Sequence, residues 1–136
     1  MGEEEKMFPY ELVRLSDLEN EVVVTVLSPM GSPYWEARIE VSSTFVKGGT
    51  LLVLSPLKLD SWAKALDELE RGQDVVWMET DRGPTISIQL DGERDCPEVV
   101  VDDESLSMVT VRIPIALEEG WIDDQRNCLR RFSEQM

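Results

Sequence analysis

The sequence contains no histidine and has two cysteines, Cys96 and Cys128, and these scarcities exclude several kinds of active site. Without an imidazole the chain cannot build the serine–histidine–aspartate triad of hydrolases or a histidine-containing zinc site. The two cysteines are far apart in sequence and match no metal or redox spacing, so we expect free thiols. Because no general base lies near either one in sequence, an inert thiol is a better interpretation than a catalytic cysteine.

Long apolar runs are also missing. No segment approaches the roughly 18 uninterrupted apolar residues of a membrane span, and the N-terminus lacks the basic start and apolar stretch of a secretion signal. We therefore expect a cytoplasmic protein. The 136 residues fit one domain, 1–136, and we expect the charged residues 1–6 to be frayed.

Basic residues are scarce relative to acidic ones. The chain has 13 lysines and arginines against 28 aspartates and glutamates, a formal net charge of −15. Such a charge disfavours nucleic acid and anionic membranes as partners, whereas a basic protein is its natural complement. The alternative is that the acidic surface only keeps the protein soluble.

Two segments have helical spacing of apolar residues. The first, about 56–71, follows Ser55-Pro56, an N-cap with a proline in the first turn, and ends at Gly72, which suits a left-handed C-terminal cap. The second, about 118–132, has acids at its start and arginines near its end, as the helix dipole favours.

Most of the remaining chain reads as strands, because β-branched residues or alternating apolar residues fall between turn signals. In the longest of them, 34–46, we expect Phe45 to face inward with Ile39, and Lys47-Gly48-Gly49-Thr50 to turn the chain into a buried strand over 51–54. Pro114 belongs at a sheet edge because it has no amide hydrogen. The expected strands are 10–15, 21–27, 34–46, 51–54, 74–78, 85–90, 99–101 and 108–115. The pattern predicts an α+β fold, an antiparallel-rich sheet of about seven or eight strands packed by two amphipathic helices.

Two clusters of acids are the candidate partner-binding residues. They are Asp91, Glu93 and Asp95 in one turn and Asp102, Asp103 and Glu104 in another. The first cluster resembles the start of a calcium loop but lacks the downstream glutamate that such a loop requires. The second could hold a divalent ion or act as an acid–base pair, although adjacent acids between two strands are typical of an exposed turn. No glycine-rich phosphate loop is recognisable, and we expect no catalytic residue, cofactor or metal ion.

The four tryptophans could form a ligand cage, but each also falls on an apolar helix face or strand position. We therefore predict that Trp35, Trp62, Trp77 and Trp121 are core residues. If one of them is exposed, Trp35 is our candidate for an interface anchor together with Tyr34, because both stand beside a loop rich in proline and glycine.

The order of these segments resembles a family of small, acidic, uncharacterised bacterial proteins over nearly the whole chain. The residues that carry the likeness are Ile39-Glu40-Val41-Ser42-Ser43, Leu51-Leu52-Val53-Leu54-Ser55-Pro56, Leu59-Asp60-Ser61-Trp62-Ala63-Lys64-Ala65-Leu66, Gly72-Gln73-Asp74-Val75-Val76-Trp77-Met78, Thr85-Ile86-Ser87-Ile88 and Glu119-Gly120-Trp121-Ile122-Asp123-Asp124. The middle part is more loosely similar to WapI-type immunity proteins. That likeness implies an antiparallel sheet packed by helix and a role in neutralising a toxin domain. It carries over no site residue, since the matching positions are structural.

Two function classes follow from the sequence. The first is a non-enzymatic binding module, of which an immunity-type inhibitor is one form, whose acidic surface binds a basic partner protein such as a toxin domain. The second is a carboxylate-based, metal-dependent enzyme that uses the same acids as ligands. A structural subunit of a homo-oligomer is a third alternative.

Overall fold

The computed structural model describes residues 7–79, 83–92 and 95–135. Eight strands and two helices lie within these ranges, which confirms the predicted α+β class. In chain order the elements are β1 (Tyr10–Ser16), β2 (Glu21–Pro29), β3 (Trp35–Ser42), β4 (Lys47–Leu54), α2 (Pro56–Glu70), β5 (Val75–Trp77), β6 (Thr85–Gln89), β7 (Glu98–Asp103), β8 (Val109–Pro114) and α3 (Trp121–Glu134). Glu93, one of the acids singled out above, lies outside the described residues.

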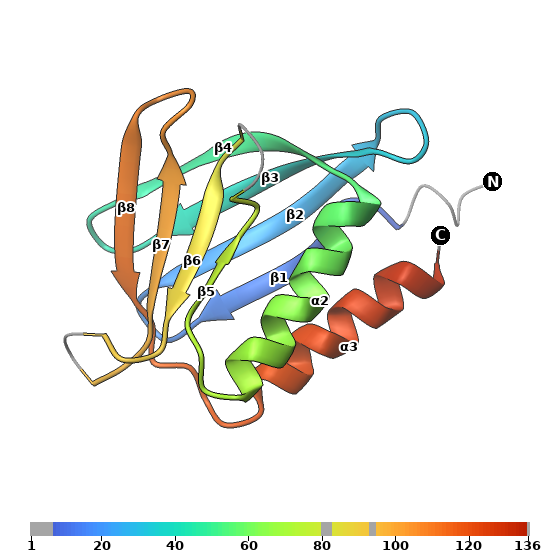
Figure 1. Ribbon diagram of the computed structural model, residues 1–136. Coiled ribbons are helices and arrows are strands. Elements are labelled where there is room, and N and C mark those ends of the chain that lie inside the picture. The colour runs from blue at the N-terminus through green and yellow to red at the C-terminus, as the bar shows by residue number, and fades with distance from the viewer. Residues whose placement is uncertain (1–6, 80–82, 93–94, 136) are drawn as a thin grey trace.

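The strands form two antiparallel sheets of four strands, ordered β1-β2-β3-β4 and β5-β6-β7-β8. The sequence pattern predicted the strands but placed them in one sheet. The division follows from α2, which takes the chain away from edge strand β4 before β5 begins, so that these two strands do not pair. In each sheet every strand pairs with its neighbour in sequence, and the strands of the second sheet run across those of the first (Figure 1).

Helix α2 begins and ends where the sequence indicates. The Ser55 side chain accepts a hydrogen bond from the backbone N–H of Lys58, and Pro56 occupies the first turn, where it removes no helical hydrogen bond. At the other end Gly72 has a φ of +83°, and the amides of Gly72 and Gln73 donate to the carbonyls of Leu69 and Glu68. These two bonds define a Schellman motif, which satisfies carbonyls that the helix leaves unpaired.

The hairpin of β3 and β4 differs from the expectation in two ways. Strand β3 ends at Ser42, because the Ser43 hydroxyl accepts hydrogen bonds from the amides of Phe45 and Val46 and holds a turn there. Phe45 was predicted to face inward and is instead 95% exposed. Strand β4 is half-exposed: Leu52 and Leu54 are buried, whereas Leu51, which faces the other way, is 51% exposed.

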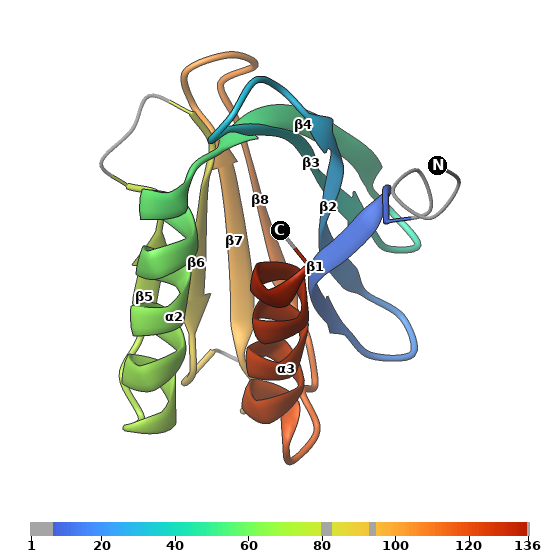
Figure 2. The ribbon, with the colours of Figure 1, turned by 90° about the vertical axis from the view of Figure 1, so that its right-hand side faces the viewer.

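The two helices lie together in the angle between the sheets and close the core (Figure 2). Trp62 of α2 stacks on Trp77 of β5 with ring centroids 4.7 Å apart, and Phe132 of α3 packs against Tyr10 of β1 at 5.3 Å. Helix α3 starts at Trp121, later than the predicted residue 118, because Gly120 adopts a φ of +90° just before it. In the described part of the chain, neither helix combines the length and apolar character that a bilayer crossing requires.

Candidate functional site

The acids predicted from the sequence lie at the two ends of β7. Asp91 and Asp95 are exposed in the β6–β7 connection, and Asp102, Asp103 and Glu104 lie at the other end of the strand (Figure 1). A strand of this length separates its ends by about 17 Å. The two clusters therefore do not converge on one point, and each must be considered separately.

The sequence suggested that Asp102 and Asp103 lie in an exposed turn, but the structure places them in a strand. Both belong to β7, where Asp102 pairs with Thr85 and Thr110, and Asp103 pairs with Val109. The sheet ladder on both sides of β7 continues past the last valine, so the turn begins only at Glu104. As a result the Asp103 side chain is buried, with 8% of the residue exposed.

The aromatic pair Tyr34 and Trp35 lies far from both acidic clusters. Tyr34 is 48% exposed beside the β2–β3 loop, while Trp35 is half-buried and packs edge-on against Phe132 with centroids 5.3 Å apart. Trp62 and Trp77 are buried in the core, and Trp121 packs against it, partly covered. Packing therefore accounts for all four tryptophans, with Tyr34 leaving the larger free surface of the predicted anchor pair.

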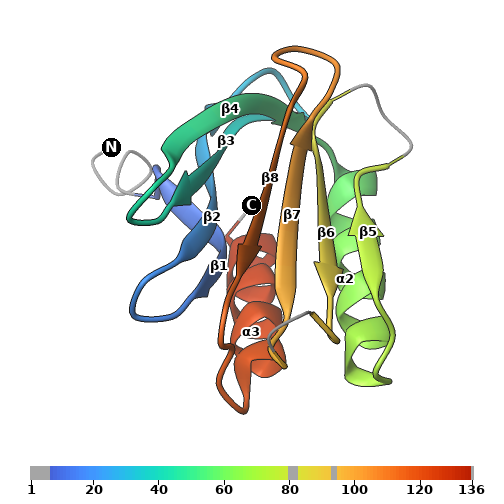
Figure 3. The same cartoon turned by 90° about the vertical axis from the view of Figure 1, so that its left-hand side faces the viewer.

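A crevice where the two sheets cross is a candidate site that combines apolar walls with a buried acid. It has a volume of about 240 Å³ and is lined by residues of both sheets. Figure 3 shows edge strand β8 of the second sheet crossing edge strand β4 of the first. We call it the β4–β8 pocket. Its lining consists of Ile39, Val41, Val46, Lys47, Gly48, Gly49, Thr50, Val101, Asp103, Ser107, Val109 and Val111.

The pocket exists because β4 carries glycines where the opposite sheet approaches. Side chains alternate along a strand, so residue 48 shares the inner face with Thr50 and buried Leu52. A β-carbon placed on Gly48 would meet no other atom within 4 Å, whereas one on Gly49 would come within 2.6 Å of the Ile39 carbonyl oxygen. The missing side chain at Gly48 thus leaves open space, and Gly49 permits the close approach of β3. The turn predicted at Lys47-Gly48-Gly49-Thr50 is therefore wrong, because these residues open β4. Glycines inside a strand often mark a place where another backbone or a ligand approaches closely.

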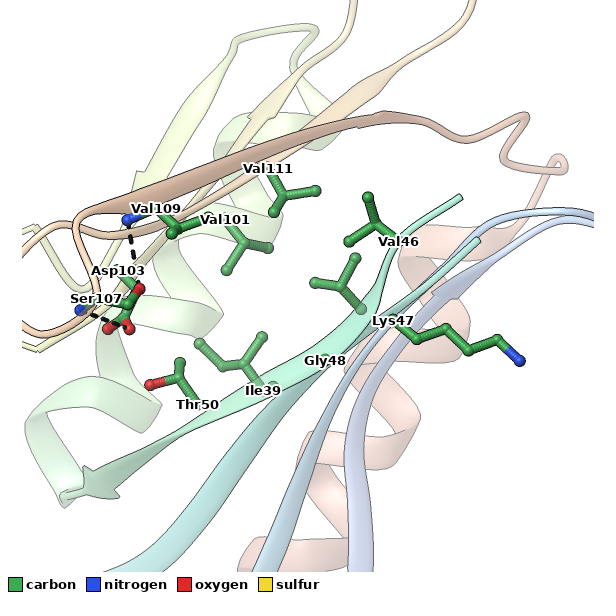
Figure 4. Close-up of a pocket in the computed structure, with 12 residues that line it drawn as sticks. Ile39, Val46, Lys47, Gly48, Thr50, Val101, Asp103, Ser107, Val109 and Val111 are labelled. Carbon is green, nitrogen blue, oxygen red and sulfur yellow. Dashed lines mark hydrogen bonds between the residues drawn. The ribbon is translucent and has the colours of Figure 1, made fainter. Parts of the chain in front are cut away.

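Asp103 supplies the buried charge of this pocket. Figure 4 shows its carboxylate at one end, close to Ser107 and Thr50, with Val46, Val101 and Val111 toward the other end and the Lys47 side chain pointing away. Oδ2 of Asp103 accepts a 3.3 Å hydrogen bond from the Ser107 amide. Oδ1 is closed off from solvent and has no hydrogen-bond partner among the residues that the structure describes. The pocket therefore joins apolar walls to one incompletely paired carboxylate.

Arginines neutralise many acids elsewhere on the surface. Arg14 bridges Glu11 and Glu21, and Arg112 holds the buried carboxylate of Glu98 at 2.7 Å. Arg126 joins the two helices by pairing with Asp67 at 2.7 Å and with Glu70, and these contacts raise the pKa of its guanidinium. By contrast, within the described ranges no ion pair involves Asp91, Asp95, Asp103 or Glu104.

The cysteines and the acids are the groups that nucleophilic or metal chemistry would require in this chain. Both cysteines are free thiols, and burial raises the pKa of Cys128, which lowers its thiolate fraction. Across residues 7–79, 83–92 and 95–135, no three cysteine, aspartate or glutamate side chains are grouped closely enough to hold a metal ion. The described acids offer a charged surface and one pocket carboxylate.

The fold and the pocket thus define an α+β protein of two crossed antiparallel sheets with a small, apolar, singly charged crevice. Residues 10–136 match the sequence profile of a family of unknown function, DUF5959, and the chain belongs to that family. No curated protein and no solved structure matches it.

Proposed function

We propose that this protein is a non-enzymatic binding module that recognises a basic partner protein. The observation that supports the proposal is the distribution of its charge. The arginines pair with some of the acids around β1, β3 and the helices, and the acids that stay exposed without an ion pair in the described chain include Asp91, Asp95 and Glu104. Unpaired exposed carboxylates at net charge −15 steer a cationic protein toward the surface and repel anionic ones.

The resemblance to WapI-type immunity proteins suggests a more specific form of this function. An inhibitor that blocks a basic toxin domain in a bacterial cytoplasm needs no chemistry of its own, and an acidic surface accelerates its encounter with the toxin. We therefore propose a toxin domain as the first partner to test, with exposed Tyr34 and half-buried Trp35 as candidate aromatic contacts.

The proposal can be tested by capture and then by kinetics. The tagged protein is used to capture partners from a lysate of its source at low and at moderate salt. A complex that forms through electrostatic attraction weakens as salt screens the charges.

The captured protein is then purified, and its association rate is measured with wild type and with Asp91→Lys/Asp95→Lys. We expect the double variant to associate more slowly and to show a flatter salt dependence. As a matched control, Asp60→Lys/Glu68→Lys makes the same change of charge on exposed positions of α2. Equal rates for the two variants would remove the β6–β7 connection from the interface.

The carboxylate-based enzyme remains the alternative proposal, and a direct measurement separates the two. Calorimetric titration with calcium, magnesium and manganese, with thermal unfolding in parallel, reports an ion site through heat and stabilisation. Heat and a raised melting temperature, both abolished by Asp102→Asn/Asp103→Asn, would favour the enzyme over the binding module. The homo-oligomer alternative is tested by sedimentation of the isolated protein over a range of concentrations, which measures its state of association.

A further inference from the structure

We propose that the β4–β8 pocket receives a lysine side chain of the basic partner, with its methylene stem against the valines and its ammonium group at Asp103. This inference rests on the proposed function and adds to it a specific anchoring contact. The exposed acids attract the partner from a distance, whereas the pocket fixes one of its residues in place.

The walls of the pocket match the stem of such a side chain. Val46, Val101 and Val111 contribute branched apolar groups from the β3–β4 turn, β7 and β8 (Figure 4). Gly48 of β4 leaves open space because a β-carbon there would meet no atom within 4 Å. A lysine carries a flexible chain of four methylene groups that readily packs along apolar surface while its charged end seeks a polar partner. A fully polar ligand would gain nothing from these walls.

The charge of the pocket selects a cation. A buried carboxylate without full pairing is costly, and a nearby cation offsets that cost more effectively in an apolar surrounding than in water. Within the described chain no cationic side chain pairs with Asp103, and Lys47, which also lines the pocket, points away from it (Figure 4). The fold therefore leaves this position to a group from another molecule. Thr50 and Ser107 place further oxygen atoms near the same end.

The geometry favours lysine over arginine. A guanidinium binds a carboxylate best through two parallel hydrogen bonds, one to each oxygen. At Asp103 this arrangement is blocked, because Oδ1 is closed off from solvent and Oδ2 already accepts a bond from the Ser107 amide. A compact ammonium group needs only one approach to the carboxylate.

The test uses three blocked tripeptides, acetyl-Gly-Xaa-Gly-amide, in which Xaa is lysine, arginine or norleucine. Each is titrated into the isotope-labelled full-length protein and followed by amide and methyl resonances. We expect the lysine peptide to shift the signals of Gly48, Thr50, Val101 and Val111 and to bind several-fold more tightly than the other two. Norleucine has a similar stem without the charge, and arginine has the charge without the compact head, so the comparison isolates each contribution.

Matched variants separate the pocket from the overall charge. Asp103→Asn and Asp95→Asn each remove one negative charge, but only the first does so in the pocket. Gly48→Val fills the pocket from the inner face of β4, while Leu51→Val alters the outer face of the same strand. We expect Asp103→Asn and Gly48→Val to weaken lysine-peptide binding about tenfold, the loss of one charge-assisted contact, and the two control variants to change it less than about twofold. The wild-type shift pattern decides the matter even if a variant fails to fold.

The outcomes distinguish this inference from the proposed function. Three results would overturn the proposal that the β4–β8 pocket binds a lysine side chain. They are resonance shifts confined to the β6–β7 connection, equal binding of the three peptides, and equal effects of Asp95→Asn and Asp103→Asn. If salt-sensitive capture of a basic protein succeeds in those cases, the binding-module proposal stands without it. If the lysine peptide occupies the pocket but no basic protein is captured, a basic protein is not the source of the lysine. That result would reject both this inference and the proposed function.

Discussion

The side chain of Gln125 exchanges two hydrogen bonds with the backbone of Arg14, as a neighbouring strand would. Its Oε1 accepts from the Arg14 amide and its Nε2 donates to the Arg14 carbonyl, each at 3.0 Å, and the glutamine is 4% exposed. Because β1 is an edge strand, these bonds satisfy backbone groups that no strand pairs. Helix α3 thereby covers a sheet edge that would otherwise be open to another chain.

Gln125→Ala should therefore destabilise the protein by about 1–3 kcal/mol, the cost of leaving buried backbone groups without partners. Denaturant unfolding measures the change. The control is Gln135→Ala, at an exposed position at the end of the same helix, which should stay within about 0.5 kcal/mol of wild type. Equal stabilities of the two variants would show that water replaces the glutamine without loss.

Phe132 and Phe45 provide a matched test of the core. Phe132 is fully buried between Tyr10 and Trp35, whereas Phe45 is 95% exposed in the β3–β4 loop. Phe132→Ala should cost about 3–5 kcal/mol because it leaves a cavity in the core. Phe45→Ala should change the free energy of unfolding by less than about 0.5 kcal/mol. A large loss at Phe45 would restore the inward position predicted from the sequence.

Asp17 makes the stability depend on pH. Burial acts to raise its pKa, but hydrogen bonds from the amides of Ala116, Asn20 and Glu19 outweigh burial and hold the pKa below its ordinary 3.8. A lowered pKa in the folded state means that the ionised form contributes stability above about pH 4, and that this contribution disappears as the pH falls through the folded-state pKa. Asp17→Ala should thus destabilise the protein by about 1 kcal/mol at pH 7 and by progressively less as the solution is made acidic. Parallel unfolding curves at pH 7 and at about pH 3 check the sign. If the difference in unfolding free energy between wild type and Asp17→Ala is as large at about pH 3 as at pH 7, packing rather than the ionised carboxylate causes the loss.

Cys128 should react slowly with thiol reagents in the folded protein. Burial is the main cause of its raised pKa, so the reactive thiolate is scarce at neutral pH. In a Cys96→Ser background, alkylation at pH 7 should be several-fold slower than in denaturant and should accelerate as the pH rises. The reciprocal Cys128→Ser variant reports Cys96 alone. Equal rates in folded and denatured protein would contradict the burial of Cys128.

Local signals in the sequence predicted the parts of the fold that depend on local physics. Ser55-Pro56 and Gly72 mark the ends of α2, and the alternation along β3 and β6 identifies their buried faces. The division into two sheets could not be predicted this way, because strand pairing depends on where α2 directs the chain. The same limit applies to Asp103. The run of acids at 102–104 suggested an exposed turn, but pairing with Val109 of β8 extends β7 to Asp103, whose side chain is buried.

The site was predictable in part. Asp103 was among the candidate acids, but it was grouped with Asp102 and Glu104. The sequence did not indicate that Asp103 is buried, whereas Asp102 is partly exposed and Glu104 is exposed. The paired glycines at 48 and 49 were interpreted as a turn, although they lie inside β4 and create the open space opposite β8. What joins these two features is the crossing of the sheets, which brings together segments more than fifty residues apart in sequence.

The contact of α3 with β1 has a consequence for synthesis. Strand β1 is synthesised before helix α3, which covers it. Tyr10 donates to the carbonyl of Cys128 at 2.7 Å, and the Arg14 amide has no partner on α3 until Gln125 emerges from the ribosome. Both sheets can pair while the chain is still being made, since each joins consecutive strands. The nascent protein therefore carries an uncovered edge at β1 until α3 (Trp121–Glu134) has been synthesised, and deletion of this helix would make that temporary exposure permanent.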